Sequence, residues 1–218
     1  MSNFRFTRVD RFPPVVKNLI IINVLVWIAQ LIYDKKDGLT FFLTSKLGLY
    51  PINDPEFRPY QIATHMFSHS SYSPQGSIVF YHILFNMFTL YMFGRILENV
   101  WGAKRFLIFY LACGVGAAAA HLIMQYLMGG VSIAVGASGA VMGVMAAFAY
   151  LFPNTELYIM LIPIPVKAKW AMLGLAAIDL FGGISGGDGI AHFAHLGGAL
   201  TGIIIVLIWN KTNRKTLY

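Results

Sequence analysis

The chain has 218 residues, of which 57% are hydrophobic and only 11% are charged. Soluble domains carry about 25% charged residues, so this composition excludes an ordinary soluble domain and predicts a membrane protein. The formal net charge of +7 does not indicate a nucleic-acid partner, because the basic residues lie in short stretches between apolar segments.

The apolar segments predict six membrane-spanning helices. A bilayer core of about 30 Å needs roughly 20 apolar residues in a helix. Residues 15–33 form the first candidate, and the proline pair just before it suits a helix start. The second and third are residues 77–97 and 103–128, and the third carries glycines and alanines typical of close helix packing. The last three candidates are residues 138–151, 168–181 and 190–209.

Four connecting segments separate these helices. Aromatic and polar residues alternate in residues 34–76, which predicts a structured, partly interfacial first loop with short amphipathic helices. Residues 129–137 form a glycine-containing loop, and residues 154–165 are too short to span. Residues 182–189 hold five glycines and are expected to be mobile.

The charge distribution predicts an orientation. Six helices place both termini on one side, and twelve of the 16 Lys and Arg residues fall there. The positive-inside rule therefore predicts a multi-pass protein of the inner or plasma membrane with both termini cytoplasmic. We expect a cytoplasmic N-terminal segment at 1–14, one six-helix domain at 15–209 and a basic cytoplasmic tail at 210–218.

Polar residues from three helices are expected at one depth. The helix at residues 138–151 measures roughly 21 Å at 1.5 Å per residue, so Ser138 at its start should lie below the outer surface, beside water. His82 and His195 each stand five residues inside the expected outer ends of their helices, and Asn86 lies one turn below His82. Polar groups inside a membrane are costly and usually mark function.

Glycine spacing predicts that two of these helices approach closely. Gly139 and Gly143 are four residues apart, as are Gly198 and Gly202. Such small-residue faces let helices pack at short distance, which would bring Ser138 and His195 into contact.

The residue types point to acyl transfer. Ser138 would be the nucleophile and His195 the general base that takes its proton. No acidic residue is expected in place to orient His195, so we predict a Ser-His dyad. The Asn86 amide, a His82 ring N–H and the Ser138 backbone N–H could stabilise an oxyanion. This chemistry needs no cofactor.

Three sequence motifs follow one another on the expected helices: His82-Ile83-Leu84-Phe85-Asn86-Met87, Gly136-Ala137-Ser138-Gly139, and Ala194-His195-Leu196-Gly197-Gly198 followed by Gly202. In this order they resemble the motifs of the rhomboid family of intramembrane serine proteases. Gly94 and Glu98 also match its GxxxE pattern, and the likeness covers the whole six-helix core.

The resemblance implies a bacterial-type six-helix bundle in the lipid bilayer that cleaves single transmembrane segments near their outer ends. It assigns Ser138 as nucleophile, His195 as base, and His82 and Asn86 to the oxyanion hole. It also implies that the fifth helix and the glycine loop act as lateral gate and cap. Tyr60-Gln61 replaces the Trp-Arg pair common in the family's first loop.

Alternatives stay open at this point. A catalytically inactive relative could bind transmembrane clients without cutting them, and polar residues at one depth can also mark a small transporter. His192 and His195 have a spacing that can bind metal, but no carboxylate is expected beside them, so no metal site is predicted. The sequence assigns no role to Asp179 and no oligomeric state.

Overall fold

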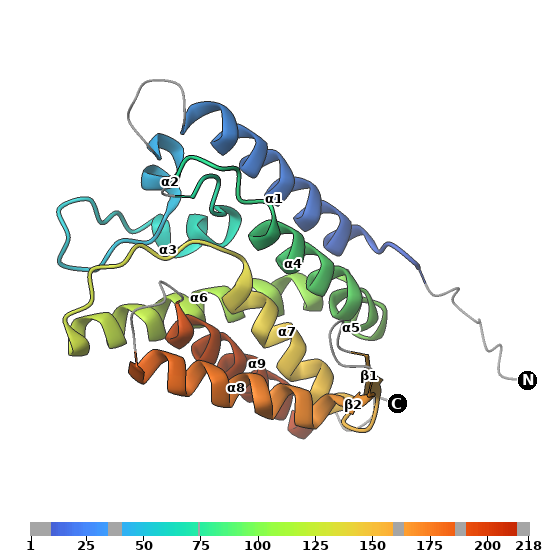
Figure 1. Ribbon diagram of the computed structural model, residues 1–218. Helices are drawn as coiled ribbons and strands as arrows, with labels where there is room; N and C mark the ends of the chain where they lie inside the picture. The colour runs from blue at the N-terminus through green and yellow to red at the C-terminus, as the bar shows by residue number, and fades with distance from the viewer. Residues whose placement is uncertain (1–9, 35–40, 74, 159–163, 186–190, 213–218) are drawn as a thin grey trace, which may run out of the picture.

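The computed structural model of the chain describes residues 10–34, 41–73, 75–158, 164–185 and 191–212. Within these residues the regular secondary structure is helical apart from one two-stranded hairpin and two isolated β-bridges (Figure 1). The elements are α1 (Pro14–Tyr33), α2 (Phe42–Leu47), α3 (Gln61–Thr64), η1 (His65–Phe67), α4 (Tyr81–Thr89), η2 (Leu90–Gly94), α5 (Arg95–Trp101), α6 (Ala103–Met128), α7 (Ser138–Leu151), β1 (Glu156–Leu157), β2 (Val166–Lys167), α8 (Ala168–Ser185) and α9 (His192–Thr212).

The long helices form the predicted all-α membrane bundle. Four described helices, α1, α6, α8 and α9, are long and apolar enough to cross a membrane. A fifth segment runs from α4 through the π-helical turn η2 into α5 without leaving helical backbone angles. The sixth, α7, has 14 residues and falls short of a bilayer core of about 30 Å, as expected.

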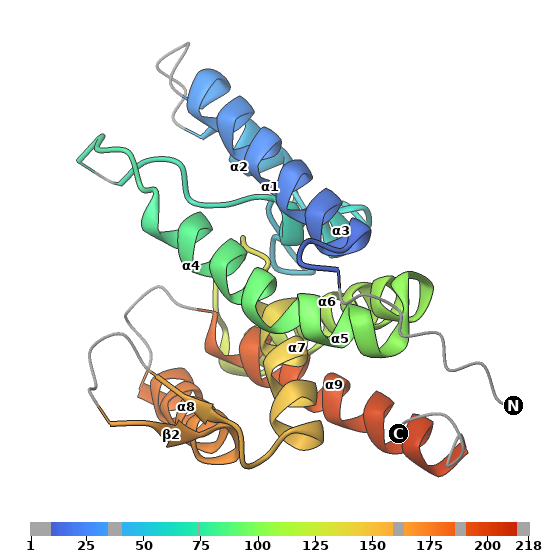
Figure 2. The ribbon, with the colours of Figure 1, turned by 90° about the vertical axis from the view of Figure 1, so that its right-hand side faces the viewer.

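The shortest of these helices, α7, lies at the centre of the bundle. In Figures 1 and 2 it lies between α1 on one side and α8 on the other, and it packs against α6 and α9. The core includes fully buried Phe106, Phe109 and Tyr110 of α6 beside Val144 of α7. Large apolar side chains on the outer faces of α1 and α8 are exposed, as expected for helices that face lipid.

Five helix ends differ by more than one residue from the predictions. α5 ends at Trp101 rather than residue 97, and α9 ends at Thr212 rather than residue 209. The second long helix begins at Tyr81 instead of residue 77, because Ile78 pairs with Tyr72 and the Val79 N–H donates to the Ser71 carbonyl. α8 continues to Ser185, so its glycines at 182 and 183 are helical rather than part of a loop. α9 begins at His192. His82 and His195 therefore lie nearer to the starts of α4 and α9 than the predicted five residues. The mobility predicted for residues 186–189 concerns a segment outside the described residues.

The predicted close approach of α7 and α9 is confirmed. A Cβ atom on Gly198 would overlap the Gly139 carbonyl oxygen, and one on Gly202 would lie 2.7 Å from the Gly143 oxygen. Only glycine lets the two backbones meet at these points, so α9 is held against α7 along two turns.

The first loop has the short helices predicted for it, and buried polar side chains hold it. The Asp34 carboxylate accepts hydrogen bonds from the backbone N–H groups of Leu43 and Thr44 and from the hydroxyls of Thr44 and Ser71, at 2.6–3.1 Å. Gln61 accepts from the Arg58 N–H and donates to the Glu56 carbonyl. A buried carboxylate with four donors fixes the loop against the end of α1.

The Gly94-Glu98 pair joins the second long helix to α1. The Glu98 carboxylate accepts from the N–H groups of Val15 and Val16 at 2.9 and 2.8 Å, and so satisfies donors in the first turn of α1. A Cβ atom on Gly94 would lie 3.1 Å from the Val16 side chain, so glycine there permits the contact.

Candidate active site

Ser138 is the first residue of α7 and opens onto a cavity of about 450 Å³. Ala137 precedes it as the N-cap and its side chain makes no capping hydrogen bond. The first backbone N–H groups of a helix have no partner within the helix, so they remain available to a ligand. The cavity is lined by Ser70, Tyr81, His82, Phe85, Asn86, Ile133, Ala134, Val135, Ser138, Ala191 and His195.

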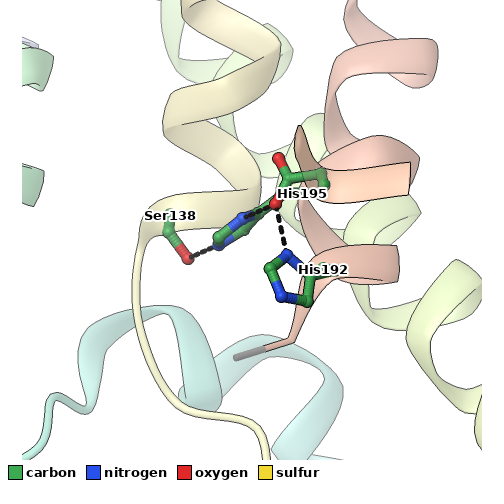
Figure 3. A network of polar contacts seen from close by, with 4 residues as sticks. Ser138, His192 and His195 are labelled. Atoms are coloured by element: carbon green, nitrogen blue, oxygen red, sulfur yellow. Dashed lines mark hydrogen bonds and ion pairs between the residues drawn. The ribbon is translucent and has the colours of Figure 1, made fainter. Parts of the chain in front are cut away.

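His195 contacts Ser138 directly. Its Nε2 lies 2.7 Å from the Ser138 Oγ, and Figure 3 shows the two side chains pointing toward each other from α9 and α7. The structure therefore contains the hydrogen bond expected between these residues. Gly139, which follows Ser138, and Gly198, three residues after His195, provide the backbone contact between the two helices.

A carboxylate lies on the other side of the His195 ring. Asp179 of α8 places its Oδ1 2.9 Å from the His195 Nδ1. The expectation that no acidic residue would be in place to orient His195 is wrong. Asp179 is buried, at 6% exposure, although α8 exposes most of its other side chains.

His192 shares the same carboxylate. Its Nδ1 lies 2.8 Å from the Asp179 Oδ1, and in Figure 3 dashed lines run from the rings of His192 and His195 to the same oxygen atom. The carboxylate predicted to be missing from the His192–His195 pair is thus present. The three ligand atoms lie within 4.8 Å of one another, a spacing that could also hold a metal ion. Hydrogen bonds join them here.

His82 faces Ser138 across the space left by Gly136. The His82 Nδ1 accepts the Ser70 backbone N–H at 3.3 Å, so its Nε2 carries the proton and can donate. A Cβ atom on Gly136 would lie 2.8 Å from this Nε2 and 3.6 Å from the Ser138 Oγ. Gly136 also has φ +123°, which other residues rarely adopt. Glycine at 136 therefore keeps open the space between the donor and the serine.

Asn86 lies one turn along α4 from His82 and also lines the cavity. Its Nδ2 donates one hydrogen to the His82 carbonyl at 2.9 Å. An amide nitrogen carries two hydrogens, so a second donor belongs to the same group.

Two histidines of the first loop, which the sequence suggests are structural or solvated, support the loop that precedes Ser138. The His65 carbonyl accepts the Gly136 N–H at 3.0 Å, and the His69 Nε2 lies 3.5 Å from the Ala137 nitrogen. The His69 ring meets the His82 ring edge-on at 5.1 Å. Burial and the neighbouring His82 lower the pKa of His69 to about 3, so this ring is neutral. The four-residue spacing of His65 and His69 was the only sequence signal for this pair.

Together these residues make a site suited to acyl transfer. A hydroxyl is hydrogen-bonded to an imidazole, the imidazole is backed by a carboxylate, and ring and amide N–H groups line the same cavity. This is the arrangement of nucleophile, base and oxyanion donors that cleaves amide bonds on several unrelated folds. The motif glycines Gly136, Gly139, Gly198 and Gly202 lie beside these groups and permit the close packing.

Comparison with known proteins identifies a matching family. Residues 56–211 match the rhomboid domain. The chain is 35% identical over 136 residues to the presenilin-associated rhomboid-like protein A, mitochondrial, of Danio rerio, covering 60% of this chain and 36% of that protein. It is 31% identical over 208 residues to the presenilin-associated rhomboid-like protein, mitochondrial, of Homo sapiens, covering 93% of this chain and 51% of the relative.

A yeast protein gives a similar result. The chain is 32% identical over 127 residues to the rhomboid protein 1, mitochondrial, of Saccharomyces cerevisiae, which covers 57% of this chain and 37% of that protein. The chain thus spans about half or less of the length of these three relatives.

Proposed function

This chain belongs to the rhomboid family, and from that premise we propose that it is a serine endopeptidase that cleaves transmembrane segments of membrane proteins. Members of this family are generally intramembrane serine proteases. The observation that supports the proposal most is the 2.7 Å hydrogen bond between the Ser138 Oγ and the His195 Nε2 at the edge of the cavity.

The reaction begins when the Ser138 Oγ attacks the scissile carbonyl carbon while the His195 Nε2 takes the hydroxyl proton. The tetrahedral intermediate collapses as His195 returns this proton to the leaving amine, which leaves an acyl-enzyme on Ser138. A water molecule, deprotonated by the same nitrogen, then attacks the ester and releases the acid.

Three donors serve the developing oxyanion. They are the His82 Nε2–H, the second Nδ2–H of Asn86 and the Ser138 backbone N–H, and the first two belong to side chains that line the cavity. The N-terminal end of α7 adds the positive end of its dipole. Removal of one oxyanion donor costs roughly 10²- to 10³-fold in kcat in a well-studied serine protease, so Asn86→Ala should slow cleavage strongly.

Labelling with a fluorophosphonate probe tests the nucleophile and the base. The purified wild-type chain should be labelled, whereas Ser138→Ala and His195→Ala should not be. Ser45→Ala is the matched serine control, because Ser45 does not line the cavity and its hydroxyl donates to the Phe42 carbonyl in the first loop. Equal labelling of Ser138→Ala and wild type would contradict the proposal.

A proteoliposome assay tests the substrate class. We propose that the substrates are single transmembrane helices, which reach the cavity from the lipid. A reporter with one such helix should be cut by wild type and left whole by Ser138→Ala. A reporter that co-purifies with wild type and stays whole would instead identify an inactive binder.

The membrane and orientation are a further part of the proposal. We propose a multi-pass protein of the inner or plasma membrane with cytoplasmic termini, because twelve of the 16 Lys and Arg residues fall on the side where both termini lie. Green fluorescent protein fused after residue 218 should fluoresce in bacterial cells, and alkaline phosphatase fused there should be inactive. The opposite pair of results would reverse the orientation.

A further inference from the structure

We propose that Asp179 is a positioning residue for the reaction: it fixes the tautomer and the ring orientation of His195, and His192 holds it in place for this task. The inference rests on the proposed function and deepens it. It starts from two hydrogen bonds to one oxygen, from His195 Nδ1 at 2.9 Å and from His192 Nδ1 at 2.8 Å.

The tautomer follows from the chemistry of the partners. An ionised carboxylate only accepts, so the Nδ1 of His195 must carry the hydrogen that it donates to Asp179. The Nε2 is then unprotonated, and its lone pair accepts the Ser138 hydroxyl at 2.7 Å. Without Asp179 the ring could carry its hydrogen on Nε2, where it could not take the serine proton.

The arrangement also stabilises the intermediate state. When His195 takes the serine proton it becomes an imidazolium cation, and the Asp179 carboxylate lies directly against its Nδ1–H. Asp179 is only 6% exposed, so water screens this attraction less than it would screen one between two exposed groups.

His192 makes the carboxylate tolerable at this depth and aims it. A buried carboxylate needs hydrogen-bond donors, and the His192 Nδ1–H supplies the second one. His192 is itself buried at 6% exposure at the first position of α9. Two donors from one helix thus fix the oxygen that reaches across from α8.

Glycines at the end of α8 allow this contact. A Cβ atom on Gly182 would lie 2.5 Å from the His192 ring, and one on Gly183 would lie 3.0 Å from the Phe193 ring. Gly182 stands three residues after Asp179, on the same face of the helix. The glycine pair therefore brings the start of α9 close enough for both histidines to reach Asp179.

The test measures the rate of fluorophosphonate labelling of Ser138 in the purified full chain between pH 5 and pH 9. This readout depends on activation of the serine and not on binding of a transmembrane substrate. The titratable and charged groups that face His195 are His82 of α4, His121 of α6, Asp179 of α8 and His192 of its own helix.

Asp179→Asn should label about 100-fold more slowly than wild type, because the general base loses its fixed tautomer. The acidic limb of its pH profile should move to lower pH, since the imidazolium loses its counter-charge. Asp179→Glu keeps the charge and should retain more of the rate than Asp179→Asn. Leu180→Ala, an exposed neighbour on α8, is the control and should label like wild type.

His192→Ala should slow labelling by about tenfold in the wild-type background and should have no further effect on Asp179→Asn. This non-additivity is expected only if His192 acts through Asp179. Size-exclusion chromatography and thermal unfolding of each variant check that the bundle is intact, and a general packing defect would move neither the pH limb nor the double-mutant term.

The possible outcomes separate this inference from the proposed function. If wild type labels on Ser138 and Asp179→Asn labels at the same rate with the same pH profile, the positioning role is overturned and the protease stands. If wild type fails to label, both are overturned. If chelation of divalent ions from wild type slows labelling as much as Asp179→Asn does, the three residues are a metal site and the positioning role is wrong.

Discussion

α8 and α9 lie side by side, and both contribute to the hydrogen-bonded chain that ends at Ser138: α8 supplies Asp179, and α9 supplies His192 and His195. The contacts that hold the two helices differ. α9 lies against α7 and α6 through glycines whose missing side chains let the backbones touch. Of the described residues of α8, only Ala168 and Asp179 are buried. Direct backbone contacts therefore fix α9, whereas α8 is held by few buried side chains.

The first loop, like α9, is held in place by many specific contacts. Asp34 accepts four hydrogen bonds there, and Gln30 of α1 donates to Ser68, Thr44 and the His69 carbonyl. The first loop supports the groups that need constant geometry, namely His82 and the loop before Ser138. α8 supplies a charge from a surface with few buried contacts, which is the kind of element that opens at low free-energy cost.

The largest effect on stability should come from adding a side chain where α7 and α9 touch. Gly198→Ala places a methyl group on the Gly139 carbonyl, and we expect the free energy of unfolding to fall by about 3 kcal/mol or more. Gly174→Ala is the matched control on α8, because a Cβ atom there meets nothing within 4 Å. Unfolding in mixed micelles measures both. A loss at Gly174 equal to that at Gly198 would remove the contrast between the helices.

An intermediate effect on stability should come from acid, through His69 in the first loop. The His69 ring has its pKa lowered from 6.5 to about 3 in the folded chain by burial and by His82. The unfolded chain therefore binds a proton near pH 6.5 and the folded chain does not, so stability falls as pH drops below 6.5. Between pH 7 and pH 5 this costs about 2 kcal/mol.

His69→Phe should remove that part of the acid sensitivity. Denaturation curves of wild type and variant at pH 7 and pH 5 measure the difference. If both proteins lose the same stability between these pH values, the ring does not titrate as its burial requires.

The smallest effect needs no mutation. Backbone amides in the middle of α8 should exchange at least about tenfold faster than those in the middle of α9, which corresponds to about 1.4 kcal/mol in opening free energy. Hydrogen exchange followed by mass spectrometry, in the same micelles for both helices, gives the comparison. Equal protection of the two helices would show that α8 is as firmly held as α9.

Much of the fold could be predicted from the sequence. The bounds of α6 and α7 agree with the prediction, because glycines and a proline punctuate their ends. The start of α4 was missed because Ile78 and Val79 have the hydropathy of a helix, whereas the backbone of residues 77–79 pairs with residues 71–73. Hydropathy alone does not distinguish a paired apolar strand from a turn of helix.

The residues around Ser138 could be predicted from the sequence, whereas the contact between Asp179 and the histidines of α9 could not. Ser138, His195, His82 and Asn86 follow from motif glycines and spacing, which act within one helix or between two neighbours. A carboxylate at 179 in an apolar helix was a visible signal of function. The histidine partners of Asp179 could not be assigned, because this needs the relative placement of α8 and α9. That placement depends on the close packing at Gly182 and Gly183, which the sequence alone does not show.

The single cysteine has a practical consequence. Cys113 is fully buried in α6 and lies where a Cβ atom on Gly143 would touch its sulfur. The wild-type chain therefore behaves toward thiol reagents as a template without a reactive cysteine. Spin labels placed at exposed positions of α8 and α9, such as Ile178 and Leu200, could report distances between the helices without any change to the native core.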